Sequence, residues 1–167
     1  MQRIIGVVAV IIGALLAPSL ISAANNEASV LKFDVMVGVT APYTGTTNPV
    51  RGLNGGGLPW DIDEAHGKLG VDGEVKVSVE GLVLARRAPV PANLQGTNPI
   101  TSFKAIVSCQ TIVDGAAVVR NVETGLFPAS ATGDATIKDV VALPSPCIAP
   151  VVFVTSPNGS WFSATGR

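Results

Sequence analysis

Short runs in which apolar and polar residues alternate are the feature that most limits the fold of this chain. The clearest is "EVKVSVE" at residues 74–80, where valines occupy every second position. Successive side chains of a strand point to opposite faces, so such a run predicts a strand with one buried face. Similar runs occupy residues 31–39, 60–69, 102–110, 116–122 and 134–143, and both sides of residues 158–159. No long stretch repeats with the helical period.

Turn-forming residues separate these runs. The chain has 18 Gly and 12 Pro, while charged residues make up only 14%, which favours many turns and few surface helices. The dipeptides Asp72-Gly73 and Asn158-Gly159 are typical of tight hairpins, so residues 60–69 and 74–84 are expected to pair. The runs predict an all-β fold of about nine strands in a two-sheet antiparallel β-sandwich, with a flattened barrel as the alternative.

The first 24 residues differ from the rest of the chain. They contain one early charge at Arg3, an apolar run, a breaking Pro18 and small residues near Ala24. This order is typical of a signal peptide, so residues 1–24 are predicted to be removed and residues 25–167 to form a single domain. We expect a secreted protein, extracellular or in the cell envelope. The alternative is a chain anchored in the membrane by an uncleaved signal.

The chain has only two cysteines, Cys109 and Cys147. Export to an oxidising compartment makes a disulfide between them the simplest interpretation, with a free buried thiol as the alternative. The bond would close a loop of 38 residues. The chain-entropy treatment gives a stabilisation of about 4 kcal/mol for a loop of this length.

Residues 60–66 concentrate polar chemistry beside one tryptophan. The polar members are Asp61, Asp63, Glu64 and His66, the only histidine of the chain. On a regular strand, even-numbered and odd-numbered residues point to opposite faces, which divides this group and predicts a strand with a solvated face. The alternative is a bulge near Glu64 that gathers the group into a metal or acid-base site.

Signatures of catalysis are missing elsewhere. The sequence has no Gly-x-Ser-x-Gly elbow and no His-Glu-x-x-His, and the glycines at residues 55–57 precede a strand instead of opening a helix. We therefore predict no enzyme activity, no catalytic or metal-binding residue and no cofactor. Trp60 and Trp161 stand in apolar alternation and are predicted to pack in the core. Asn158 has the form of a glycosylation acceptor but is interpreted first as a turn residue.

The charge composition limits the classes of partner that the chain is expected to bind. Because Arg3 is the one charged residue of the first 24, ten basic side chains stand against twelve acidic ones in residues 25–167, without a run of like charges. This composition argues against a nucleic-acid partner and against membrane binding after signal cleavage. An unknown protein or cell-surface partner remains. Residues 31–39 are expected to pair within their own domain, with donation to a neighbouring copy, and hence self-association, as the alternative.

The motifs "GLPW" at residues 57–60, "FKAIVSCQT" at 103–111 and "LPSPCIAPVVFVTSPNGSWF" at 143–162 carry a resemblance. They are similar to a group of small secreted prokaryotic β proteins of uncharacterised function. The resemblance covers most of residues 25–167 and implies that the Cys109 and Cys147 segments belong to one structural unit. The expected function is a secreted, non-enzymatic structural, surface or interaction module. The alternative is a binding module for a glycan or small ligand.

Overall fold

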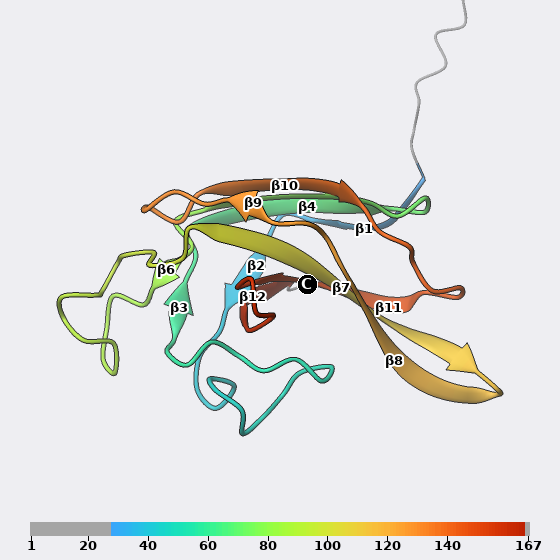
Figure 1. Cartoon of the computed structure of the whole chain (residues 1–167), viewed down its shortest axis with the longest axis horizontal. Coiled ribbons are helices and arrows are strands. Elements are labelled where there is room, and N and C mark those ends of the chain that lie inside the picture. Colours follow the sequence, from blue (N-terminus) through green and yellow to red (C-terminus); the bar gives the residue numbers. More distant parts are fainter. Residues whose placement is uncertain (1–27, 166–167) are drawn as a thin grey trace, which may run out of the picture.

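The computed structural model describes residues 28–165, which form an all-β fold (Figure 1). The predicted signal peptide at residues 1–24 lies outside the described residues. The strands are β1 (Ser29–Phe33), β2 (Met36–Gly38), β3 (Trp60–Asp61), β4 (Glu64–Gly70), β5 (Glu74–Glu80), β6 (Val83–Leu84), β7 (Ser102–Val113), β8 (Ala116–Glu123), β9 (Phe127–Pro128), β10 (Ala135–Val140), β11 (Ile148–Thr155) and β12 (Trp161–Thr165).

These strands form several antiparallel sheets. A four-stranded sheet has the order β1-β4-β5-β10, and a larger, curved sheet has the order β2-β12-β11-β7-β8, with β9 beside β7 (Figure 1). The short strands β3 and β6 pair separately. Both predicted hairpins are confirmed, because β4 pairs with β5 across residues 71–73 and β11 pairs with β12 across residues 156–160.

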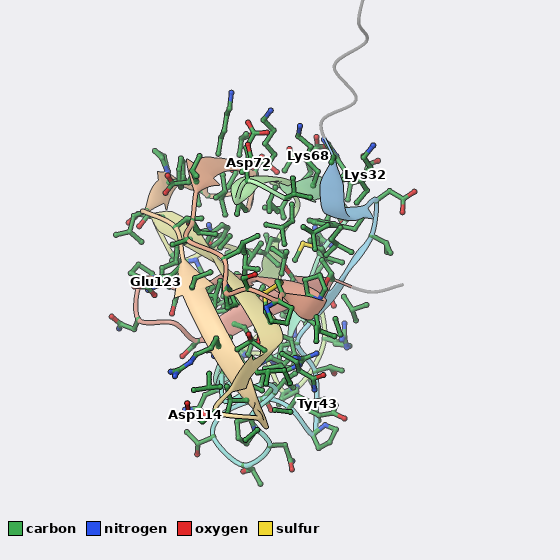
Figure 2. All side chains as sticks on the ribbon, turned by 90° about the vertical axis from the view of Figure 1, so that its right-hand side faces the viewer. Lys32, Tyr43, Lys68, Asp72, Asp114 and Glu123 are labelled. Atoms are coloured by element: carbon green, nitrogen blue, oxygen red, sulfur yellow. A yellow bond between two sulfur atoms is a disulfide. The ribbon has the colours of Figure 1, made fainter. Side chains whose placement is uncertain are left out.

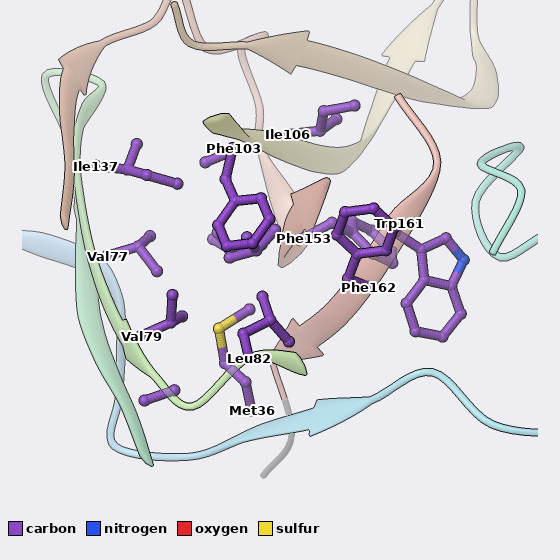
Figure 3. Packing of buried hydrophobic residues seen from close by; sticks show 14 of the residues in the cluster. Met36, Val77, Val79, Leu82, Phe103, Ile106, Ile137, Phe153, Trp161 and Phe162 are labelled. Carbon is purple, nitrogen blue, oxygen red and sulfur yellow. The ribbon is translucent and has the colours of Figure 1, made fainter. Parts of the chain in front are cut away.

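The core lies where the four-stranded sheet faces the larger sheet (Figure 3). Val77 and Ile137 come from the four-stranded sheet, and Phe103 comes from the start of β7, where β9 pairs with it. Trp60 stacks on Phe162 with ring centroids 3.9 Å apart, and Phe103 contacts Trp60 edge-on at 6.4 Å. Aromatic pairs in these arrangements add to the stabilisation from burial alone. Trp60 and Trp161 are both buried, as the sequence predicted.

The disulfide between Cys109 and Cys147 is present and confirms the predicted pairing. Cys109 lies on β7 and is fully buried, while Cys147 directly precedes β11. The bond therefore reinforces the pairing of β7 with β11 at the end of the sheet where their register shifts between residues 148 and 151.

The N-terminal run at residues 31–39 is not the single strand that its alternation predicted. β1 pairs with β4 in the four-stranded sheet, whereas β2 pairs with β12 in the larger sheet. The chain crosses between the sheets at residues 34–35, and the crossing shifts the alternation by one position. Met36 is consequently buried, while Val37 is 58% exposed. Both halves of the run pair with strands of their own chain.

The connection after β5 is held by an aspartate. Asp134 accepts hydrogen bonds from the Gly81 backbone N–H at 3.0 Å and from the hydroxyls of Ser130 and Thr132 at 3.0 and 2.6 Å. The neighbouring Gly133 has a φ of +85°, and a Cβ there would lie 2.2 Å from the Leu82 carbonyl oxygen. Only glycine allows these two backbones to approach so closely.

Removal of the disulfide tests its contribution to stability. We expect the double variant Cys109→Ala/Cys147→Ala to lose about 4 kcal/mol of unfolding free energy, because its unfolded chain regains the freedom of the 38-residue loop. Urea unfolding of both proteins measures the difference. A loss below roughly 1 kcal/mol would show that the bond constrains the unfolded chain little.

Acid should weaken the connection held by Asp134. Hydrogen bonds from Thr132, the Gly81 backbone and Ser130 lower the pKa of Asp134 below its ordinary value. A lowered pKa stabilises the fold above the ordinary aspartate range, and that stabilisation is lost as the pH falls through the lowered pKa. Asp134→Asn should therefore be less stable than the parent at neutral pH, and the two should converge in acid. Urea unfolding at roughly pH 6 and pH 3 tests this. A difference in unfolding free energy between the two proteins that is the same at both pH values would contradict it.

Candidate functional site

The polar segment at residues 60–66 is not the regular strand that the sequence predicted. β3 ends at Asp61 and β4 begins at Glu64, because β3 pairs with β6 whereas β4 belongs to the four-stranded sheet. The break between these strands changes the alternation, so that Trp60 and Ala65 are both buried. The segment is therefore divided by a change of sheet.

Asp61 and Asp63 lie beside an arginine pair from the loop after β6. The Arg86 backbone N–H donates to Asp61 at 3.0 Å, and its guanidinium donates to both oxygens of Asp63 at 3.2 and 3.4 Å. Arg87 forms an ion pair with Asp61. Burial favours a higher pKa for Asp61, but the Arg86 N–H and the Arg87 guanidinium outweigh it and lower the pKa. Both carboxylates are therefore neutralised locally.

The side chains of Glu64 and His66 instead point to the exposed outer face of β4. The four residues of the alternative site therefore differ in their partners, because Asp61 and Asp63 bind the arginine pair whereas Glu64 and His66 lie on the exposed strand face. Within residues 28–165, no group of three or more His, Cys, Asp or Glu side chains is arranged to hold a metal ion.

A row of lysines crosses the outer face of the four-stranded sheet. In the strand register Lys32 is opposite Lys68, Lys68 is opposite Lys76, and Lys76 is opposite Lys138. These four side chains, here called the lysine row, come from β1, β4, β5 and β10. They are four of the five lysines in the whole chain. Figure 2 shows Lys32 and Lys68 on the side of this sheet that faces away from the core.

The buried face of the sheet determines this alignment. Val75 and Val77 on β5 and Ile137 on β10 point into the core, so the residues between them point outward. Neighbouring strands lie about 4.8 Å apart, and four strands therefore spread the lysine row over roughly 14 Å. A depression of about 690 Å³ lies over this face and is lined by all four lysines.

Rows of other chemistry flank the lysines. On one side, His66 is opposite Ser78 and Ser78 is opposite Thr136, which forms a row of hydrogen-bonding side chains here called the polar row. Beyond the polar row, Glu64 is opposite Glu80. The outer face therefore changes from acidic to polar to cationic along β4 and β5, while Asp34, directly after β1, adds a carboxylate to the same depression as His66.

One carboxylate on the other side of the lysine row partly neutralises it. Glu74 contacts Lys76 at 2.8 Å and Lys68 at 3.1 Å, and these contacts lower the pKa of Glu74. Lys32 and Lys138 have no ion-pair partner among residues 28–165. Like charges directly opposite each other on a sheet are destabilising. Glu74 compensates the central pair, Lys68 and Lys76, whereas Lys138 remains a like charge directly opposite Lys76.

Sequence reasoning missed the lysine row because its members lie far apart in the chain. Each lysine stands singly in an alternating run, and only the pairing of strands brings them together. One part of the signal was present: a hairpin centred on Asp72 places Lys68 opposite Lys76. Extending the row to Lys32 and Lys138 requires the order and register of β1 and β10.

Comparison with protein families, curated protein sequences and solved structures finds no match to this chain. No helix within residues 28–165 has the length and apolar character needed to cross a bilayer.

Repulsion within the lysine row predicts that removing one of its charges stabilises the fold. We expect Lys138→Thr to raise the unfolding free energy by about 0.5 kcal/mol at low salt, because it removes a like charge opposite Lys76. The gain should shrink at high salt, where charges are screened. Urea unfolding at two salt concentrations measures it.

Lys104→Thr is the contrasting variant, because Lys104 is buried and contacts Glu123 at 2.6 Å. That variant should lose stability at both salt concentrations. A loss of stability in Lys138→Thr at low salt would show that repulsion in the row is unimportant.

Proposed function

We propose that this protein is a secreted, non-enzymatic interaction module that binds an anionic ligand through the lysine row. The single observation that carries the proposal is the direct alignment of four lysines on adjacent strands. A bound anion would replace repulsion between neighbouring ammonium groups with attraction. Lysine supplies compact point charges without the fork geometry of arginine, so such binding depends on charge more than on the shape of one anion.

The ligand of this module is extended rather than a single small ion. Four ammonium groups spread over roughly 14 Å match several negative charges in a line. Stacking on a tryptophan platform plays no part, because Trp60 and Trp161 are buried in the core. Binding by charge therefore distinguishes this proposal from the usual recognition of neutral sugars by aromatic side chains.

We propose that the module acts outside the cell and is folded as a two-sheet sandwich. The disulfide between Cys109 and Cys147 supports an oxidising, extracellular setting. The core shared by the four-stranded sheet and the larger sheet supports a two-sheet sandwich, with residues 25–167 as one domain. Together with the motifs quoted above, these features favour a small secreted protein whose partner is a component of the cell surface.

Charge variants test the proposal with two linear polyanions, long-chain polyphosphate and a polyuronate. Lys76→Gln/Lys138→Gln should weaken binding roughly ten-fold at low salt, because two of the four aligned charges are lost. Glu74→Gln should strengthen binding, because it removes the carboxylate that competes for Lys68 and Lys76. Titration calorimetry at two salt concentrations measures both changes.

Arg120→Gln is the matched control, because Arg120 is an exposed cation on β8, outside the four-stranded sheet. It should leave the affinity within about two-fold of the parent. Absence of binding to either polyanion, or equal losses in the control and the lysine variant, would overturn the proposal.

A further inference from the structure

We infer that the ligand is a linear acidic polysaccharide that runs across the strands, with its carboxylates on the lysine row and its hydroxyl groups on the polar row. This inference rests on the proposed function and specifies its ligand. Its basis is the arrangement of three different kinds of side chain in successive rows of one sheet face.

The acidic residues determine the direction of the chain. Glu64 and Glu80 lie beyond the polar row, and Glu74 lies on the opposite side of the lysine row. A polyanion parallel to the strands would meet carboxylates at both ends of the face. A polyanion perpendicular to the strands meets one lysine on each strand and avoids Glu64 and Glu80. The carboxylates nearest to it are Glu74, which contacts Lys68 and Lys76, and Asp34, which lines the same depression.

The spacing of the lysines suits one negative charge for each sugar ring. Adjacent strands are about 4.8 Å apart, so consecutive lysines of the row begin at that separation. An extended polyuronate carries one carboxylate on every pyranose ring, and one ring with its glycosidic oxygen advances by a similar length. The charge spacing along such a chain is therefore similar to the spacing of the lysines.

The polar row favours a sugar over other linear polyanions. Ser78 and Thr136 offer hydroxyl groups and His66 offers a ring nitrogen, all beside the lysine row. These groups form hydrogen bonds with the hydroxyl groups that a uronate ring carries and that the interior of a polyphosphate chain lacks. Single-stranded nucleic acid is bound largely by stacking of bases on aromatic side chains. Phe33, the phenylalanine of the four-stranded sheet, is buried and offers no such platform.

A comparison of four probes tests the inference by titration calorimetry on the purified protein at low salt. The probes are an oligogalacturonate, the same oligosaccharide with its carboxyls methyl-esterified, polyphosphate, and single-stranded DNA. We expect the oligogalacturonate to bind most tightly, and esterification to weaken binding at least ten-fold because it removes the charges.

The variant Ser78→Ala/Thr136→Ala separates recognition from charge. It should weaken binding of the oligogalacturonate about five-fold, through the loss of two hydrogen-bonding groups, while affinity for polyphosphate stays unchanged. Both positions are outside the core, and thermal unfolding of the variant checks that its fold is retained. Arg120→Gln, in which an exposed cation on β8 is removed, again serves as the control.

The outcomes distinguish this inference from the proposed function. Equal affinity for polyphosphate and oligogalacturonate, with no effect of the polar-row variant, would overturn the inference and leave the anion-binding module standing. Tighter binding of DNA would identify a nucleic-acid partner and overturn the inference as well. Binding of none of the three anionic probes would overturn both.

Discussion

Burial of every second side chain is the constraint on which the four-stranded sheet depends. Val75, Val77 and Val79 on β5 are all essentially inaccessible to solvent, and Ile137 meets them from β10. A slip of one residue in the pairing of either strand would turn these side chains outward and bring charged ones into the core. The register is therefore specified strongly. The alignment of the lysines on the outer face follows from the same register, because the outer residues are the ones left between the buried positions.

The sequence predicted the parts of the fold that depend on local pattern. The alternation in residues 74–80 and the turn at Asp72-Gly73 identified the β4–β5 hairpin, and the even count of cysteines identified the disulfide. Predictions were wrong where a run passes from one sheet to another. Residues 31–39 and 60–66 both look continuous, yet each is divided by such a crossing. Alternation cannot reveal a crossing, because strand partners distant in the chain decide where a strand ends.

The candidate site could be predicted less well from the sequence than the fold could. The polar groups of residues 60–66 are adjacent in the chain, but in the structure the two aspartates bind an arginine pair while Glu64 and His66 lie on an exposed strand face. The lysine row shows the opposite relation, since its members lie between residues 32 and 138 and share a line only through three strand pairings. In a β protein, the side chains that form a surface come from different strands, so proximity in sequence is a poor guide to a site.

Structural and functional demands are divided between different parts of the molecule. The stacked rings of Trp60 and Phe162 and the bond between Cys109 and Cys147 stabilise the interior and the larger sheet. The outer face of the four-stranded sheet contributes little to that core and can accept charges that repel one another. We propose that a bound anion compensates the charges of Lys32 and Lys138, which Glu74 does not contact.

Mapping by nuclear magnetic resonance tests the central claim most directly. Backbone amide shifts of the isotope-labelled protein would be followed during titration with an oligogalacturonate. Our account predicts changes concentrated at the lysine row and the polar row on β1, β4, β5 and β10, with the β7–β8 hairpin unaffected. Changes centred on that hairpin, or spread evenly over the surface, would contradict the account.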